Sequence, residues 1–175
     1  MKNTKKLFVF IIAGPPGAGK TTLSKLLVKH YNCDYVSEDE LAKSLFPGLL
    51  YAEIENFPDK LKLVMDGVLK RTKQIFNNGK SVVVDRINLE KEFIEEAKKV
   101  FRTHLAIIIL WPPTEVTIQR DLERECWTSG EQAIKLFYKK YEALKPIIGV
   151  EHYLDNSHQT SEETFRKLVA ILSNL

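Results

Sequence analysis

The sequence predicts an α/β fold, in which a parallel β-sheet is covered by helices on both faces. Short apolar runs alternate with segments of helical periodicity along the 175 residues, and this alternation is typical of a parallel sheet. The first of these runs, Leu7–Ala13, is apolar without interruption, as expected of a strand that is buried on both faces. A glycine-rich loop follows it directly and leads into an apolar stripe with helical spacing.

Six elements are predicted in the first part of the chain. Its helices carry apolar side chains at spacings of three and four residues, which indicate one inward face. Ser37 and Glu40 have the spacing of a capping box, which marks the start of the second helix. The letters "PGLL" and "FP" interrupt the chain before the third helix, and "NNGK" ends that helix. The predicted elements are a strand at Leu7–Ala13, a helix at Thr21–His30, a short strand within "CDYVSED", a helix beginning in "SEDELAKSLF", a helix at Asp59–Asn77 and a strand at Ser81–Asp85.

Six further elements are predicted in the rest of the chain. Pro112 and Pro113 stop a fourth strand, and "CWTSGEQ" interrupts the helix that follows it. We expect Ser129 and Gln132 to cap the next helix, and Thr160 with Glu163 to form the capping box of the last one. The predicted elements are a helix at Glu90–Phe101, a strand at His104–Trp111, a helix at Thr114–Arg124, a helix carrying Ile134, Phe137, Tyr138, Tyr141 and Leu144, a strand at about Val150–Leu154, and a last helix with the stripe Phe165, Leu168, Val169 and Leu172.

Length, composition and charge favour a single soluble domain over residues 1–175. The chain has a net charge of +3, which permits an anionic substrate but is far from the charge density of a strong nucleic-acid binder. Cys33 and Cys126 have no metal-binding spacing, and we interpret them as neutral thiols. The amino terminus imitates a signal peptide, but its apolar run ends within eight residues in the glycine loop. No run approaches the roughly 20 apolar residues of a membrane span, so we expect a cytoplasmic protein without membrane contact.

The glycine-rich loop fits a phosphate-binding motif. The letters "GPPGAGKT" satisfy GxxxxGK[ST] at every fixed position, between a predicted strand and a predicted helix. Backbone N–H groups and the positive end of the helix then form an anion site, Lys20 reaches the β- and γ-phosphates, and the Thr21 hydroxyl completes a magnesium shell. The alternative, a tight turn that binds nothing, leaves the intact motif unexplained. The residues predicted to bind the nucleotide are Gly14, Pro15, Pro16, Gly17, Ala18, Gly19, Lys20, Thr21 and Thr22, of which Thr22 either packs or touches the α-phosphate.

Polar residues at the end of the third strand indicate a second part of the site. Asp85 ends "SVVVD", and ligands of open α/β sheets bind beyond the carboxyl ends of the strands. We expect Asp85 to hold magnesium together with Thr21; helix capping or a salt bridge is the alternative. Arg86 either contacts substrate or lies on the surface, and Asn88 is expected to cap the next helix.

The acids after the second strand include a candidate general base. A phosphoryl acceptor hydroxyl needs a carboxylate that orients it and takes its proton. Glu38 and Asp39 both follow that strand, and we favour Asp39. The alternative is that these acids only cap the helix and interact with its dipole.

Two arginines near the middle of the chain are candidate catalytic residues. Arg120 and Arg124 are four residues apart and share one helix face. The segment 120–131 is predicted to be a small helical lid that brings them to the transferring phosphoryl group. The alternative is ion pairing with neighbouring acids on a solvated face. For Trp111 and Trp127 we favour packing, although Trp127 could instead stack on a base.

Four segments together carry a resemblance to a known family. The letters "GPPGAGKTT", "SEDELAKSL", "VVVDRINLEKE" and "PPTEVTIQRDLER" resemble the P-loop kinase domain of polynucleotide 5′-hydroxyl kinases, within the wider group of small P-loop kinases that includes zeta-toxin-like and nucleoside or nucleotide kinases. The resemblance covers roughly residues 7–125. It implies the P-loop NTPase fold, with five parallel strands in the order 2-3-1-4-5, Asp39 as the general base, and Arg120 and Arg124 as lid arginines.

The chain departs from that family at one position. The family pattern has an arginine three residues after the base, where it grips the acceptor's phosphate, and this chain has Ala42 there. Lys43 is adjacent, but one step along a helix turns it about 100° away. The acceptor is therefore the part of the function that the sequence defines least.

The function expected from the sequence is magnesium-dependent transfer of the γ-phosphate of ATP or GTP to a hydroxyl group. The acceptor ranked first is a polynucleotide 5′-hydroxyl end, RNA in particular. The second is a small molecule such as a nucleoside, a nucleotide or a nucleotide sugar. The alternative outside the enzymes is a nucleotide-sensing module whose lid movement signals to a partner. Oligomeric state and the choice between ATP and GTP are not predicted.

Overall fold

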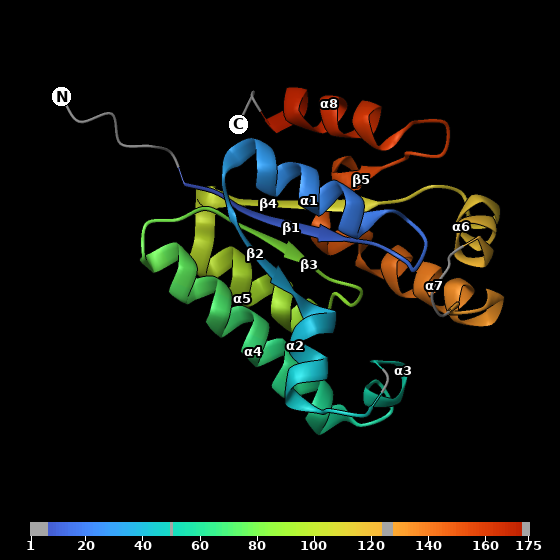
Figure 1. Ribbon diagram of the computed structural model, residues 1–175, viewed down its shortest axis with the longest axis horizontal. Coiled ribbons are helices and arrows are strands. Elements are labelled where there is room, and N and C mark those ends of the chain that lie inside the picture. The colour runs from blue at the N-terminus through green and yellow to red at the C-terminus, as the bar shows by residue number, and fades with distance from the viewer. Residues whose placement is uncertain (1–6, 50, 124–127, 173–175) are drawn as a thin grey trace.

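Five parallel strands form one sheet in the computed structural model (Figure 1), which describes residues 7–49, 51–123 and 128–172. The strand order is β2-β3-β1-β4-β5, as predicted. Because neighbouring strands all run parallel, their carboxyl ends lie at one edge of the sheet. The strands are β1 Val9–Ala13, β2 Asp34–Ser37, β3 Val82–Asp85, β4 Leu105–Leu110 and β5 Tyr153–Leu154.

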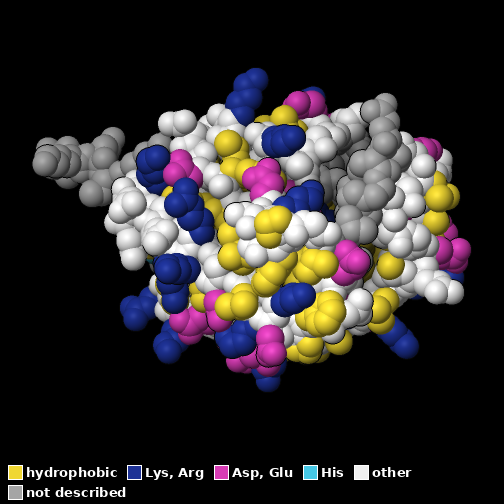
Figure 2. Space-filling view, turned by 60° about the horizontal axis from the view of Figure 1, so that its bottom comes forward, with side chains coloured by type: hydrophobic (Ala, Val, Ile, Leu, Met, Phe, Trp, Pro, Cys, Tyr) yellow, Lys and Arg dark blue, Asp and Glu magenta, His cyan; other side chains and the backbone are white. Residues whose placement is uncertain are grey.

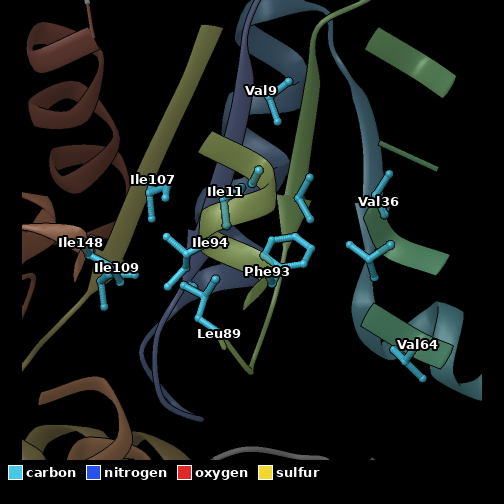
Figure 3. Close-up of a cluster of buried hydrophobic side chains, with 14 of the residues drawn as sticks. Val9, Ile11, Val36, Val64, Leu89, Phe93, Ile94, Ile107, Ile109 and Ile148 are labelled. Atoms are coloured by element: carbon cyan, nitrogen blue, oxygen red, sulfur yellow. The ribbon is translucent and has the colours of Figure 1, made fainter. Parts of the chain in front are cut away.

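Helices cover both faces of the sheet, and the alternation of side chains along β1 shows why. Val9 and Ile11 pack with residues of α4, α5 and α7 on one face (Figure 3), whereas Phe10 and Ile12 pack with α1 and α8 on the other. None of the described helices is long and apolar enough to span a bilayer. The helices are α1 Lys20–Tyr31, α2 Glu38–Leu45, α3 Tyr51–Ile54, α4 Pro58–Asn77, α5 Lys91–Phe101, α6 Thr114–Leu122, α7 Glu131–Ile148 and α8 Ser161–Leu172, with 3₁₀ turns at Arg102–His104 and Val150–His152.

Two of the four predicted side-chain caps, those of α2 and α8, are confirmed. The Ser37 hydroxyl accepts a hydrogen bond from the Glu40 N–H (3.2 Å) at the start of α2. Thr160 and Glu163 bind each other reciprocally before α8. The cap predicted for α7 is wrong, because its N-cap is Gly130 without a side-chain bond, and the Ser129 N–H instead donates to Asp121.

The structure differs from the sequence prediction at two elements. The short helix α3 lies between the two breaks in the chain, where no helix was predicted. The fifth strand is shorter than predicted, because Val150–His152 forms a 3₁₀ turn and only two residues pair with β4. Both differences lie in short segments whose conformation depends on tertiary contacts more than on periodicity.

Glycines let the P-loop approach the sheet closely. Gly14 has φ +141°, and a Cβ at this position would lie 2.5 Å from the carbonyl oxygen of Leu110. Gly17 has φ +83°, and its Cβ would lie 2.7 Å from the carbonyl oxygen of Thr117 in α6. The loop is therefore in contact with β4 and α6 at positions where only glycine fits.

This close approach predicts a difference between two Gly→Ala variants. Gly14→Ala combines positive φ with a backbone clash and should lower the free energy of unfolding by about 3 kcal/mol. Gly79→Ala is the matched control, because Gly79 has φ +76° but nothing within 4 Å of the added methyl; it should cost only about 1 kcal/mol. Equal losses in urea or thermal unfolding would contradict the clash.

Candidate active site

The carboxyl ends of β1, β2 and β3 surround a cavity of about 270 Å³. The P-loop follows β1, α2 begins directly after β2, and Asp85 is the last residue of β3. These three strand ends lie at the same edge of the sheet (Figure 1), and Lys20, Thr21, Asp39 and Asp85 line the cavity there. The cavity is lined by Pro16, Lys20, Thr21, Lys25, Tyr35, Ser37, Asp39, Glu40, Lys43, Tyr51, Asp85 and Ile87.

The P-loop has the geometry of an anion cradle. Gly19 is the N-cap of α1 in a left-handed conformation, and the first turn of α1 contains no acidic residue. The positive end of the helix dipole therefore faces the loop without a carboxylate of its own first turn to neutralise it. The Lys20 ammonium donates to the Pro15 carbonyl (2.9 Å), and the Asn156 amide donates to the Ala18 carbonyl (3.0 Å).

Thr21 and Asp85 lie together, as the sequence predicted. The Thr21 hydroxyl donates to Asp85 Oδ2 at 2.7 Å. A hydroxyl and a carboxylate are hard oxygen ligands of the kind that Mg²⁺ prefers, and Mg²⁺ commonly takes its remaining ligands from water and phosphate. The described residues contain no group of three or more His, Cys, Asp or Glu that could hold a metal alone. The pair therefore fits a magnesium ion carried in with a nucleotide, and its role as metal ligand stays a prediction.

Tyr35 also binds Asp85, which the sequence analysis missed. Its hydroxyl donates to Asp85 Oδ2 at 2.9 Å. Burial, together with the nearby Asp85 charge, raises the pKa of Tyr35 well above its usual range, so the phenol remains a hydrogen-bond donor. The contact could have been predicted from strand alternation, because Tyr35 and Ser37 share a face of β2, and Ser37 pairs with Asp85 in β3.

Asp39 and Lys43 form an exposed ion pair on the wall of the cavity. Their side chains are 44% and 60% exposed, and the Lys43 ammonium lies 2.7 Å from Asp39 Oδ2. Lys43 does point away from position 42, as expected, but it lines the cavity together with Asp39, because residues four apart share a helix face. Ala42, by contrast, is buried.

Glu38 is buried outside the cavity lining, and both oxygens of its carboxylate accept hydrogen bonds. It is 1% exposed and accepts hydrogen bonds from the Arg86 guanidinium (Nε, 3.0 Å) and from the N–H groups of Ile87 (2.9 Å) and Asn88 (3.1 Å). A carboxylate with three sets of donors has little capacity left for an acceptor hydroxyl. Of the two acids after β2, Asp39 is the one that faces the cavity.

The placement of Arg86 corrects the sequence analysis. Arg86 was expected to contact substrate or to lie on the surface, and both expectations are wrong, because its side chain is 0% exposed. It is paired with Glu38 and Glu90, and its guanidinium lies 3.7 Å from the centre of the Phe93 ring. Burial alone would lower the pKa of Arg86, but the two carboxylates raise it, so the side chain remains charged.

Asn88 does not cap α5, as had been expected. The N-cap of α5 is Glu90. The Asn88 amide instead donates to the Tyr51 hydroxyl (3.2 Å) and to Glu55 (2.6 Å). The reason is that its partners come from α3 and from Glu55 directly after it, a segment in which the sequence analysis predicted no helix.

Arg120 lies on the other side of the P-loop from Asp39. Its guanidinium donates to the carbonyls of Asn156 (3.0 Å) and Ser157 (3.2 Å). It lines a depression with Gly17, Gly19, Lys20, Thr21 and Thr22, and a second with residues of the β5–α8 loop and α8. Arg124 and Trp127 lie outside the described residues, and Trp111 packs against the rings of Tyr138, Tyr141 and Tyr153.

A family model described as an AAA domain, AAA_33, matches residues 9–142. The match covers most of the chain, so the chain belongs to this family. Its five-stranded sheet and intact P-loop are those of the P-loop kinase fold.

Two curated relatives match shorter parts of the chain. The protein named "Putative adenylate kinase" of Thermococcus onnurineus strain NA1 is 36% identical over 77 residues, which are 44% of this chain and 39% of the relative. The cytidylate kinase of Methanococcoides burtonii strain DSM 6242 is 27% identical over 116 residues, 65% of this chain and 61% of the relative. The chain therefore spans less than two thirds of the length of either.

Solved structures show the fold. A gluconokinase from Sinorhizobium meliloti 1021 has a TM-score of 0.75 at 16% identity, over 97% of this chain and 94% of that one. The structure of the Pnkp1/Rnl/Hen1 RNA repair complex has a TM-score of 0.65 at 18% identity, over 83% of this chain and 48% of that one.

The buried charges beneath the cavity predict a pH dependence of stability. Burial and the neighbouring Glu38 raise the pKa of Glu90 above its ordinary 4.5, against the opposing effect of Arg86. A raised carboxyl pKa means that the folded state favours the protonated form. The contribution of Glu90 to stability is then full below pH 4.5 and is lost as the pH rises through its raised pKa.

We therefore expect the free energy of unfolding of the wild type to fall, relative to that of Glu90→Gln, as the pH rises from about 4 to about 7. Urea unfolding at several pH values measures this difference. Glu95→Gln, with a side chain 59% exposed on the same helix, controls for loss of one negative charge. Parallel pH curves for wild type and Glu90→Gln would contradict the prediction.

Proposed function

From its membership of this family, we propose that the chain is a magnesium-dependent phosphotransferase that moves the γ-phosphate of ATP or GTP to a polynucleotide 5′-hydroxyl end, RNA in particular. One observation carries the proposal: the Asp39 carboxylate lines the same cavity as Lys20, Thr21 and Asp85. A carboxylate opposite a phosphate cradle is what an acceptor hydroxyl needs.

The roles follow from the chemistry of each group. The P-loop and Lys20 hold the donor phosphates, and Thr21 and Asp85 would hold Mg²⁺. When bound, the metal ion neutralises charge on the phosphates. Asp39 orients the acceptor hydroxyl and takes its proton at a carboxylate oxygen. Arg120 stabilises negative charge from the donor side of the loop.

The segment 120–131 is proposed as the lid of a single kinase domain. Asp121 supports this proposal, because its buried carboxylate accepts hydrogen bonds from the N–H groups of Ser129 (2.7 Å) and Gly130 (3.2 Å). These bonds hold together the two ends of the proposed lid. Arg120 would then act at the base of the lid.

Cations and aromatic rings on the acceptor side support a polynucleotide. Lys25 and Lys43 line the cavity and suit an anionic acceptor. About one turn after Lys43, the Phe46 ring lies 5.7 Å from the Lys60 ammonium, which also lies 4.2 Å from the ring of Phe57, and Phe57 is 48% exposed. Apolar side chains gather on the face where α2, α3 and α4 lie (Figure 2). Aromatic rings beside cations are typical of single-stranded nucleic-acid binding. The likeness to a structure that contains Pnkp1 agrees with this choice.

A small-molecule acceptor is the second candidate. It is favoured by the cavity volume of about 270 Å³, which suits a ligand no larger than one nucleotide, and by relatives named as nucleotide kinases. A third hypothesis, a nucleotide sensor without transfer, has no feature of the cavity in its favour.

An acceptor panel tests the function. Protein, Mg²⁺ and γ-labelled ATP or GTP are incubated with 5′-hydroxyl RNA and DNA oligonucleotides, the same oligonucleotides with 5′-phosphate, nucleosides, nucleoside monophosphates and nucleotide sugars. We expect label on 5′-hydroxyl oligonucleotides alone. Label on a small molecule would select the second candidate, and nucleotide binding without any labelled acceptor would select the sensor.

Asp39→Asn should lower kcat by at least about 100-fold and leave the donor Kd within about twofold, because Asp39 acts on the acceptor alone. Lys20→Ala should abolish transfer and also weaken donor binding. Glu40→Gln is the matched control, since Glu40 lines the same cavity from the same helix; its kcat should stay within about threefold. Full activity of Asp39→Asn would refute the assignment of the base.

Lys43→Ala should raise the KM of an anionic acceptor by about tenfold and leave the donor KM unchanged, because a charge-assisted contact is lost. Lys43→Arg should restore most of the affinity. Lys62→Ala is the control, because Lys62 forms an exposed i,i+4 pair with Asp66, also at 2.7 Å, outside the cavity lining. Equal effects of the two alanine variants would show that Lys43 does not contact the acceptor.

A further inference from the structure

A continuous chain of hydrogen bonds runs beneath the cavity from α2 to the P-loop. Glu38, at the first position of α2, binds the N–H groups of Ile87 and Asn88 in the β3–α5 loop, and it binds the guanidinium of Arg86. We name the Glu38 carboxylate, Arg86, the Ile87 peptide groups and the Tyr141 hydroxyl the buried bridge. Each end of the buried bridge lies next to a residue of the candidate active site.

Tyr141 connects the β3–α5 loop to the P-loop. Its side chain is 1% exposed, and its hydroxyl donates to the Ile87 carbonyl (2.9 Å) and accepts from the Gly14 N–H (3.0 Å). Ile87 thus uses its N–H toward Glu38 and its carbonyl toward Tyr141. One hydroxyl with one proton satisfies two buried backbone groups from parts of the chain far apart in sequence.

The position of the Glu38–Arg86 pair indicates a role in positioning the site as well as in stability. A buried ion pair is costly to desolvate, and apolar residues of similar volume often stabilise a fold equally well. Here, however, Glu38 directly precedes Asp39, and Arg86 directly follows Asp85. Movement of the start of α2 or of the β3–α5 loop would therefore displace Asp39 or Asp85. A misplacement of about 1 Å in a catalytic group can lower the rate about 100-fold.

We propose that Glu38 and Tyr141 are positioning residues, which fix Asp39 against Asp85 and the P-loop through the buried bridge. This inference rests on the proposed function in one respect, namely that Asp39 is the base. Neither residue touches a reacting atom: Glu38 is enclosed by its donors, and the Tyr141 hydroxyl is saturated by two backbone groups.

Tyr141→Phe tests the bridge, because it removes only the hydroxyl. We expect kcat to fall by about tenfold while both KM values stay within about threefold. Tyr153→Phe is the matched control: its hydroxyl donates to the Tyr141 carbonyl (2.6 Å), outside the series of bonds that joins Glu38 to Gly14. Its kcat should stay within about twofold of the wild type. Equal kcat values for the two variants, measured below their unfolding transitions, would overturn the proposal.

Glu38→Gln separates positioning from base catalysis. It should lower kcat but keep the acid limb of the pH–rate profile, which Asp39→Asn should lose. Because Glu38 and Tyr141 hold the same peptide of Ile87, the double variant should stay within about threefold of the slower single variant instead of showing the product of the two losses. Loss of the acid limb in Glu38→Gln, or multiplicative losses, would overturn the proposal.

A measurement without acceptor distinguishes failure of the bridge from failure of the proposed function. Amide hydrogen exchange of the nucleotide-bound protein should be faster in Tyr141→Phe than in Tyr153→Phe at Gly14, Asn88 and the first turn of α2. If no acceptor is labelled by the wild type, the proposed function fails, but this difference should persist. If exchange in α2 is the same in both variants, the buried bridge fails whatever the activity.

Discussion

The ion pair between Glu38 and Arg86 is the interaction on which the geometry of the site depends. Both side chains are buried, 1% and 0% exposed, and a charge removed from water is tolerated only with close partners. The partners of Glu38 are two backbone N–H groups and a guanidinium, all from the residues directly after β3. Removing Arg86 would leave the buried Glu38 carboxylate without its cation, at a cost of about 3–5 kcal/mol. The start of α2 and the end of β3 are therefore held together more tightly than the pairing of two four-residue strands requires.

The P-loop is held by neighbours that do not depend on nucleotide. Tyr141 binds its first glycine, Asn156 binds the Ala18 carbonyl, and β4 and α6 approach so closely that a methyl group at Gly14 or Gly17 would clash with a carbonyl oxygen. A phosphate cradle that is already formed pays little reorganisation on binding, which is the condition for strong electrostatic stabilisation. The same contacts connect the donor side of the site to the acceptor side, because Tyr141 also binds the loop that Glu38 binds.

The sequence predicted those parts of the site that depend on local pattern and on the parallel sheet. The P-loop needs only its own motif, and the meeting of Thr21 with Asp85 follows from placing both at the carboxyl ends of neighbouring strands. The sequence could not predict where Arg86 and Asn88 point, because Glu38, Tyr51 and Glu55, which bind them, lie 33–50 residues earlier in the chain. Tyr141 has the spacing of an ordinary core residue, and nothing local reveals a hydroxyl partner 127 residues away. The sequence thus predicts that a polar residue lies near a strand end, but it does not predict which group that residue binds.

The exposed pair of Asp39 and Lys43 has a different physical character from the buried pair beside it. At 44% and 60% exposure the two side chains remain solvated, and such pairs contribute about 0–1 kcal/mol. An anionic acceptor could therefore draw Lys43 away from Asp39 at little cost. On the proposed function, this exchange gives Lys43 a phosphate and leaves the Asp39 carboxylate to the hydroxyl. Glu38, fixed by donors that no ligand competes for, keeps Asp39 in place while its neighbour moves. On this proposal the buried Glu38–Arg86 pair holds the base in position, and the exposed Asp39–Lys43 pair opens to admit the substrate.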